Sequence, residues 1–225
     1  TTTDFTHYRS TTIMRRIMRR MAIIHLTTLA EYVNYLSEVP AEIAELAKDV
    51  LIHVTSFYRD AAAYTVLTTV VFPALLLDRA VDVPIRLWVV GCSTGQEVYS
   101  IAIELIEFLA SAPVRPSVQI FATDISDGVL VKARLGWYPE SLADEIPPDR
   151  LARYFTKEAQ GFRIIKAIRD LCVFAKHDVT ADIPFSRIDL ISCRNVLIYL
   201  GPILQKRIFS TFHVALKPGG FLLLG

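Results

Sequence analysis

The spacing of apolar residues divides the chain into a helical first part and a second part in which strands and helices alternate. Up to about residue 81 apolar residues recur at helical spacing, and residues 41–51 are strongly helical after a turn at Val39-Pro40. From residue 85 short apolar runs alternate with helical segments. The expected strands are 85–90, 118–122, 171–175, 188–192 and 221–224, and the expected helices are 97–110, 129–134 and 203–216. Such alternation predicts an α/β fold with a parallel sheet and helices on both faces.

Two units follow from this pattern. Residues 1–81 are expected to form an N-terminal helical domain with a linker, and residues 82–225 an α/β domain. The last expected strand begins at Phe221, close to the end of the chain. An apolar strand left at a sheet edge is an aggregation liability, so we expect the α/β domain to be truncated at its C-terminal end.

Composition and charge narrow the possible classes of protein. Apolar residues make up 52% and charged residues 21%, which is globular rather than disordered. The net charge of +1 provides no general attraction for nucleic acid or an anionic membrane. The most apolar stretch, 66–77, is broken by Pro73 and is shorter than the ~20 residues of a membrane-spanning helix. The N-terminus also lacks the features of a signal peptide, so we expect a cytoplasmic protein without nucleic-acid partners or membrane insertion.

Cysteines and histidines give no sign of a metal or disulfide framework. Cys92, Cys172 and Cys193 are odd in number and far apart, and the histidines show no metal-ligand spacing. Cys92 is interpreted as a small packing residue rather than a catalytic thiol.

Three chemistries compete for the loop at residues 89–97, between an expected strand and an expected helix. A dinucleotide site requires Gly-x-Gly-x-x-Gly, but Ser93 stands where the middle glycine belongs. Residues 91–95 match the Gly-x-Ser-x-Gly elbow of serine hydrolases. That fold has strands upstream and an acid and a histidine downstream. Here the upstream part is helical, and of the late histidines His177 and His213 the second lies in an expected helix.

The third chemistry is a site for S-adenosylmethionine, in which a glycine-bearing loop passes the methionine portion and an acidic residue ending the second strand binds the ribose hydroxyls. Asp124 stands in that place. Asp124 by itself fits a helix N-cap equally well, and its combination with Gly91 favours the cofactor site. Ser192 is followed by Cys193-Arg194-Asn195-Val196, where amino-methylating enzymes of this fold carry Asn/Asp-Pro-Pro-Tyr/Phe. An oxygen acceptor is therefore favoured over a nucleobase or amide nitrogen.

Five motifs, taken in order, resemble those of the chemotaxis receptor glutamate O-methyltransferases, the CheR family. They are residues 15–21, 54–60, 91–100, 122–125 and 193–199. The resemblance implies a Rossmann-like S-adenosylmethionine-dependent methyltransferase sheet with a small N-terminal all-helical domain. It also implies a small inserted antiparallel β-subdomain, which we place at residues 154–172. The implied reaction methylates glutamate side chains of chemoreceptors and releases S-adenosylhomocysteine.

Site residues are carried over from the family position by position. The implied cofactor-binding residues are Thr55, Arg59, Gly91, Glu97, Asp124, Asp178, Val179, Arg194 and Asn195. Glu97 and Asp124 would bind the amino-acid and ribose ends, with the assignment between them open. Asp178 and Val179 would flank the adenine, and Arg194 and Asn195 would close the site beside the methyl group.

Three residues are candidates for the catalytic step. Arg59 or Arg194 would orient the acceptor carboxylate, and Tyr199 would line the methyl pocket. No general base is assigned, because a carboxylate is already ionised at pH 7. The chain departs from the family at His53, where many members have Asn. It departs again at Gln96-Glu97-Val98-Tyr99, where many have Glu-Glu-Pro-Tyr.

Four arginines predict how a receptor would dock. Arg15, Arg16, Arg19 and Arg20 fall along one side of a helix and form a basic ridge. Such a ridge is ordinarily a solvated helix face, but the resemblance favours a docking site for acidic receptor helices on the cytoplasmic domain of chemoreceptors. Family members that bind a receptor's C-terminal pentapeptide carry extra glycine-rich residues in the turn of the β-subdomain, and residues 158–161 are short by comparison, so the resemblance implies no such tethering; a monomer is expected. Two alternatives stay open: a non-catalytic cofactor-binding sensor or docking module of a multidomain signalling protein, and, less favoured, a serine hydrolase using Ser93.

Overall fold

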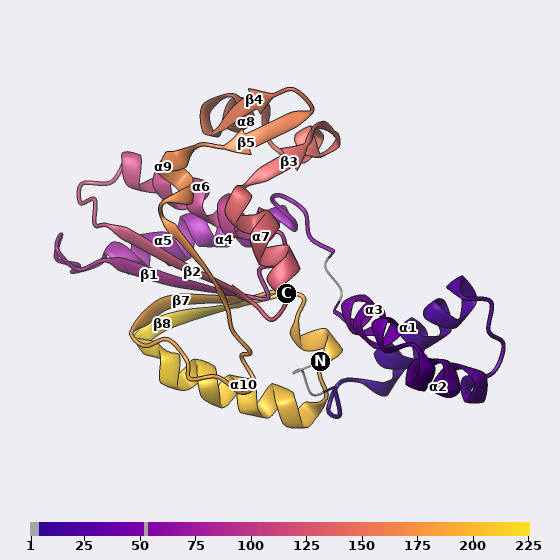
Figure 1. The fold of residues 1–225 in the computed structure, drawn as a ribbon. Coiled ribbons are helices and arrows are strands. Elements are labelled where there is room, and N and C mark those ends of the chain that lie inside the picture. The colour runs from indigo at the N-terminus through magenta and orange to yellow at the C-terminus, as the bar shows by residue number, and fades with distance from the viewer. Residues whose placement is uncertain (1–4, 52–53) are drawn as a thin grey trace.

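A bundle of three helices stands beside a larger α/β body. The computed structural model describes residues 5–51 and 54–225. The bundle consists of α1 (Ser10–Ile23), α2 (Leu29–Glu38) and α3 (Pro40–Val50), drawn in indigo and projecting from the body in Figure 1. No helix in these residues combines the length and the apolar character needed to cross a membrane.

Local signals set the helix boundaries in the bundle, and one polar contact joins its three helices. Thr28 forms a capping box with Glu31 at the start of α2, and Pro40 opens α3, where its missing N–H costs nothing. Arg20 of α1 donates two hydrogen bonds to Glu42 of α3, at 2.8 and 2.7 Å, and the Tyr32 hydroxyl of α2 donates to the same carboxylate at 2.9 Å. A bundle this small therefore depends on a charged contact as well as on apolar packing.

The body is built on a five-stranded parallel sheet in the order β6-β2-β1-β7-β8. The strands are β1 (Ile85–Val90), β2 (Val118–Asp124), β6 (Cys172–Lys176), β7 (Ile188–Cys193) and β8 (Leu216–Leu224). Every expected strand is present, and the α/β class is confirmed. β8 begins earlier than expected and pairs in parallel with β7. β7 is buried along its whole length, as is typical of a parallel sheet covered on both faces.

Helices cover both faces of the sheet. On one face lie α6 (Gln96–Ala110) and α7 (Asp127–Leu135), and on the other α10 (Pro202–Ala215) (Figure 1). Alternate side chains of β1 pack on opposite faces of the sheet: Leu87 and Val89 pack in the cluster with α6, whereas Trp88 and Val90 pack in the cluster with α10. This alternation follows from the two-residue period of a strand.

The helical stretch before residue 81 is divided between the two parts. A helix at Ala61–Val66 (α4), a π-helical turn at Leu67–Val71 (η1) and a short helix at Phe72–Leu76 (α5) belong to the α/β body. Leu67 and Phe72 are fully buried in the same core as β1 and α6. The expected helical domain 1–81 therefore includes helices that pack with the α/β body instead of the bundle. Helical periodicity shows which face of a helix is apolar, but it does not show which part of the protein covers that face.

The small antiparallel sheet is present and is longer than expected. It contains β3 (Trp137–Pro139), β4 (Phe155–Glu158) and β5 (Gly161–Ile164) in the order β3-β5-β4, with the 3-10 turn η2 (Glu140–Glu145) and α8 (Pro148–Tyr154) between β3 and β4. The expected range 154–172 missed β3, because three residues are too few to display alternation. It also ran on into α9 (Lys166–Arg169) and β6.

One buried charge cluster joins the body at the end of the sheet where β1 begins. Asp189 of β7 is 2% exposed and pairs with Arg79 and Lys217, and it accepts the backbone N–H of Arg86 at 2.8 Å. The segment before β1, β1 itself and β8 therefore meet at one carboxylate.

We expect Asp189→Ala to lower the free energy of unfolding by about 3–5 kcal/mol, because Arg79 would stay buried without its partner. Chemical denaturation measures this change. The control is Asp170→Ala, which removes the exposed pair with Lys166 and should cost at most about 0.5 kcal/mol. Equal losses in the two variants would contradict the structural role of the cluster.

Candidate functional site

A cavity opens at the carboxyl ends of β1, β2 and β7, where open α/β sheets bind ligands. Its walls come from three places: the sheet and its loops, the segment 54–59 that links the two parts of the chain, and the bundle. The expected site residues that line it are Thr55, Arg59, Gly91, Glu97, Asp124, Asp178, Val179, Arg194, Asn195 and Tyr199. Residues from four sequence motifs thus meet in one cavity.

The loop from β1 to α6 can be this tight only because it contains glycine. Gly91 has φ +66°, and a Cβ there would lie 2.5 Å from Cγ2 of Val196. Ser93 also adopts a left-handed conformation, which costs a residue with a side chain about 1–2 kcal/mol. Its backbone N–H is directed to Asp124, to which it donates at 2.9 Å. The loop is therefore fixed against the end of β2.

Asp124 is held rigidly at the end of β2. One carboxylate oxygen accepts the Ser93 N–H, and the other accepts the Ser126 N–H at 2.9 Å. The N-cap of α7 is Ser126, so Asp124 does not cap that helix. Because each carboxylate oxygen can accept a second hydrogen bond, Asp124 retains acceptor capacity for a ligand.

Glu97 lies in the first turn of α6. It accepts hydrogen bonds from the Ser192 hydroxyl at 2.6 Å and from Arg194 at 3.4 Å. Burial raises the pKa of Glu97 above its ordinary value, while these two neighbours act in the opposite direction. A cation beside this buried carboxylate would favour its ionised form.

Arg194 is turned into the protein. Its side chain is 2% exposed and donates to the Asp60 carboxylate at 2.6 Å, to the Arg59 carbonyl at 2.9 Å and to Glu97. Its guanidinium also lies over the Tyr64 ring, 5.9 Å from the centroid. With both terminal nitrogens directed to these groups, Arg194 is poorly placed to orient a substrate. Arg59 is half-buried, and its hydrogen bond within the described residues is a long one, from Nη1 to the Val54 carbonyl at 3.4 Å, so the geometry favours Arg59 for that role.

The adenine candidates lie on the loop after β6. Asp178 accepts hydrogen bonds from the backbone N–H and the hydroxyl of Thr180, at 2.8 and 2.6 Å, and Val179 is buried beside it. Asn195, with φ +56°, follows β7, and Tyr199 ends the 3-10 turn η3 (Leu197–Tyr199). Both line the cavity, as expected.

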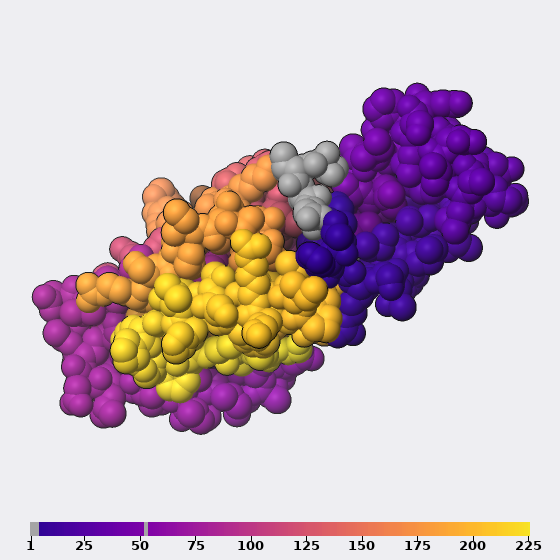
Figure 2. Space-filling view, turned by 90° about the horizontal axis from the view of Figure 1, so that it is seen from below, coloured from indigo at the N-terminus to yellow at the C-terminus, as the bar shows by residue number. Residues whose placement is uncertain are grey.

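Tyr8 lines the cavity as well, and sequence reasoning missed it. It forms an antiparallel bridge with Leu200, while Arg9 N–H donates to the Tyr199 carbonyl and Gly201 N–H to the His7 carbonyl, at 2.9 and 2.8 Å. Figure 2 shows this indigo segment lying against the orange and yellow surface of the C-terminal part. Burial, together with Asp178 and Asp124, raises the pKa of Tyr8 to about 12, so its hydroxyl is neutral at pH 7. A single tyrosine before a helix carries no periodic signal, and only the fold reveals it.

Neither of the two late histidines is placed to act as the base of a serine hydrolase. His177 Nε2 lies 3.0 Å from the Ile183 carbonyl, and its Nδ1 has no partner among the described residues. His213 is exposed on α10 and lines a separate surface hollow. Neither histidine activates Ser93. Cys92 is buried, and burial raises the pKa of its thiol well above the usual value, as befits a packing residue.

The basic ridge is shorter than expected. Arg15 and Arg19 are exposed and Arg16 is half-exposed, but the Arg20 side chain is only 13% exposed and is bound to Glu42. The expectation that all four arginines face a partner is therefore wrong for Arg20. The spacing of arginines along one helix does not show that Arg20 pairs with Glu42 on α3. His53, the departure at the cofactor site, lies outside the described residues.

Comparison with known families decides the classification. Residues 53–225 match the CheR methyltransferase SAM-binding domain, and residues 1–51 match the CheR methyltransferase all-alpha domain. The chain belongs to the CheR methyltransferase family. Its cofactor is S-adenosylmethionine, and two buried carboxylates, Glu97 and Asp124, line the cavity.

Several relatives are similar to this CheR chain over nearly its full length. Chemotaxis protein methyltransferase 2 of Pseudomonas aeruginosa is 32% identical over 95% of this chain and 76% of its own length. The chemotaxis protein methyltransferase of Borreliella burgdorferi is 30% identical over 95% and 78%. An uncharacterized 104.1 kDa protein in the hypE 3' region of Rhodobacter capsulatus is 37% identical over 99% of this chain, which spans 23% of that protein.

Proposed function

We propose that this chain transfers methyl groups from S-adenosylmethionine to glutamate side chains on the cytoplasmic domain of chemoreceptors. One observation carries the proposal: Glu97, Asp124 and Arg59 come from three distant segments and line one cavity between the sheet and the bundle. The Pseudomonas and Borreliella relatives, both chemotaxis protein methyltransferases by name, support the link to chemotaxis. We propose further that the protein acts in the cytoplasm and is a monomer.

The proposal assigns each end of the cofactor to a wall of the cavity. Glu97 would bind the amino group, because it is a buried carboxylate at the wall of the cavity and a cation beside it would favour its ionised form. Asp124 would bind the ribose hydroxyls from the end of β2. Asp178, Val179 and Tyr8 would enclose the adenine, and Gly91, Thr55 and Asn195 would complete the walls.

The chemistry requires little of the protein beyond positioning and exclusion of water. S-adenosylmethionine supplies a methyl group on a sulfonium, and the acceptor carboxylate is already ionised, so no residue needs to remove a proton. Arg59 would orient that carboxylate, and Tyr199 would line the methyl pocket. Well-oriented reactants account for roughly 7–11 kcal/mol of barrier reduction, and removing water from the carboxylate adds to this.

The outer face of α1 is the proposed receptor-docking surface. Arg15, Arg16 and Arg19 lie there beside Met14 and Met18, whose side chains are 44% and 53% exposed. Exposed methionines next to basic residues suit an acidic amphipathic helix, because thioether side chains adapt to varied apolar surfaces. The short turn at 158–161 argues against pentapeptide tethering, and a titration with a receptor C-terminal pentapeptide should therefore show no binding.

The deciding experiment incubates the protein with methyl-labelled S-adenosylmethionine and a receptor cytoplasmic fragment. We expect incorporation that is released by mild base, because glutamate methyl esters hydrolyse readily. Arg59→Met should lower incorporation by at least about tenfold, since losing a charge-assisted contact costs about 1.5–3 kcal/mol. Cofactor binding without incorporation would favour the sensor alternative, and labelling of Ser93 by a fluorophosphonate would favour the hydrolase.

We expect the affinity for S-adenosylhomocysteine to fall as the pH drops through the raised pKa of Glu97. The bound amino group favours the ionised form of Glu97, so the affinity is complete above that pKa and is lost below it. Below that pKa, binding of the cofactor releases a proton from Glu97. Calorimetric titrations over a pH series in two buffers measure both effects. Glu97→Gln should bind more weakly, by about 10- to 100-fold, with a flatter pH profile. An unchanged pH profile in that variant would remove Glu97 from the amino-group site.

We expect the double variant Arg15→Glu, Arg19→Glu to bind the receptor fragment more weakly and with less salt dependence, while cofactor affinity stays unchanged. Binding titrations at several salt concentrations measure this. Lys157→Glu with Lys166→Glu is the matched control, because it changes the net charge equally on another surface. Arg20→Glu is unsuitable, because it would place two carboxylates together inside the bundle. Equal weakening by the two double variants would point to net charge rather than docking.

A further inference from the structure

The residues on either side of Arg59 have an unusual backbone. Tyr58 has φ +48° and Asp60 has φ +59°, so two left-handed residues with side chains flank the arginine at the cavity. Such conformations persist where the surroundings over-determine them, and they cluster at functional sites. The contacts of Tyr58 and Asp60 therefore show what holds Arg59 in place.

Asp60 is held from the sheet. Its carboxylate accepts the hydrogen bond from Arg194, which also binds the Arg59 carbonyl. This contact belongs to the cavity described above.

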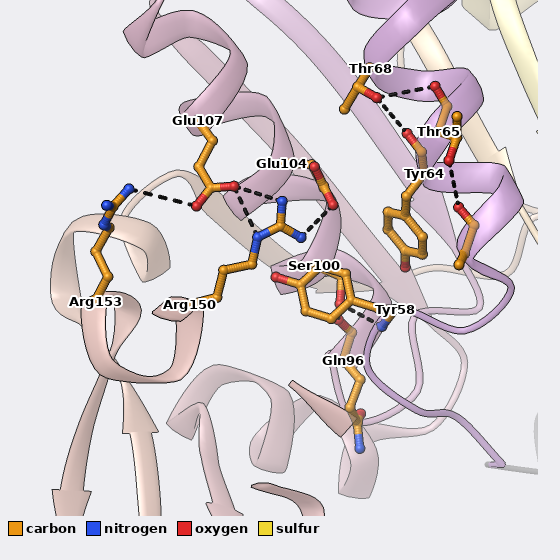
Figure 3. A network of polar contacts seen from close by, with 11 residues as sticks. Tyr58, Tyr64, Thr65, Thr68, Gln96, Ser100, Glu104, Glu107, Arg150 and Arg153 are labelled. Atoms are coloured by element: carbon orange, nitrogen blue, oxygen red, sulfur yellow. Dashed lines mark hydrogen bonds and ion pairs between the residues drawn. The ribbon is translucent and has the colours of Figure 1, made fainter. Parts of the chain in front are cut away.

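Tyr58 is held from a different part of the molecule. Arg150 of α8, in the inserted subdomain, places its guanidinium 4.9 Å from the centre of the Tyr58 ring. The guanidinium is itself fixed by two carboxylates of α6: Glu104 at 2.5 Å, and Glu107 at 2.9 and 2.7 Å. Figure 3 shows Arg150 between these carboxylates and the tyrosine ring. The Tyr58 N–H donates to the Ser100 hydroxyl, again on α6, at 3.1 Å.

Phe57 attaches the same segment to the subdomain a second time. Its N–H donates to Glu145 of η2 at 2.8 Å, and its ring lies 4.8 Å from that of Tyr138 in β3 and 5.7 Å from that of Phe155 in β4. Tyr138 also reaches the cofactor loop, where its hydroxyl donates to the Thr94 carbonyl at 2.9 Å. The inserted subdomain thus contacts two separate walls of the cavity.

We propose that Arg150 is a positioning residue for the cofactor site: by stacking on Tyr58 it fixes the backbone turn that presents Arg59 to the cavity. The inserted subdomain then shapes the cofactor site without contacting the cofactor. This inference rests on the proposed function, in which the cofactor fills the cavity that Thr55 and Arg59 line.

The ring face of Tyr58 makes the contact with the Arg150 guanidinium. The hydroxyl oxygen is buried and has no hydrogen-bond partner among the described residues. Phenylalanine should therefore replace Tyr58 without loss, whereas leucine, which lacks a π-face, should not. The two substitutions provide a matched pair in which only one removes the proposed interaction.

The experiment measures the dissociation constant of S-adenosylhomocysteine by calorimetry and the melting temperature by circular dichroism, on the full chain and its variants. We expect Tyr58→Leu to weaken binding about three- to tenfold, the range of a partly buried cation–π contact. Tyr58→Phe should bind within about twofold of the wild type. Lys157→Met, which removes an exposed pair with Glu140 on the same subdomain, should change nothing.

A second variant keeps the inference testable if Tyr58→Leu does not fold. Arg150→Lys preserves the charge facing Glu104 and Glu107 but removes the planar guanidinium from the ring. It should weaken binding as Tyr58→Leu does, and the double variant should be no worse than either single one, because both remove one interaction.

Three results would overturn the inference. They are wild-type affinity in both Tyr58→Leu and Arg150→Lys, equal loss in Tyr58→Phe and Tyr58→Leu, or additive losses in the double variant. A wild-type protein that does not bind S-adenosylhomocysteine overturns the proposed function together with the inference. Wild-type binding with unaffected variants overturns the inference alone.

Discussion

The buried guanidinium of Arg194 is the contact on which the cavity depends. It joins a residue at the end of β7 to Asp60, 134 positions earlier in the chain, and to Glu97 at the start of α6. Burying an arginine without partners would be costly, so its carboxylate and carbonyl acceptors must be in place when the core forms. These contacts hold the segment that links bundle and sheet against the end of β7.

The loop and linker around the cavity adopt conformations that chains ordinarily avoid. Ser93, Asn195, Tyr58 and Asp60 all have positive φ, and each lies at or beside the cavity. Neighbouring contacts offset this strain: Asp124 binds the Ser93 backbone, and Arg194 binds Asp60. Residues held in such conformations by their surroundings are often found at sites where backbone geometry serves binding.

Arginine has two different uses in this protein, and their distinction explains one wrong expectation. In α1, Arg15 and Arg19 remain exposed, while Arg20 is bound to Glu42 and supports the bundle. In the body, Arg79, Arg150 and Arg194 each engage buried or half-buried carboxylates. The planar guanidinium has five donors, so one arginine side chain can bind several acceptors at once. Net charge counts exposed and buried arginines alike and therefore does not distinguish the two uses.

Local patterns in the sequence determined the order and type of the elements of the sheet, because the periodicity of apolar residues reports which face of a segment is buried. They also placed Gly91 and Asp124 at strand ends, where parallel topology brings them together. The tertiary structure decided the rest: that α4 and α5 cover the sheet, that β3 joins the small sheet, that Tyr8 reaches the cavity, and that Arg194 turns inward. Each depends on a partner far along the chain, and local periodicity carries no information about which distant side chain will be opposite.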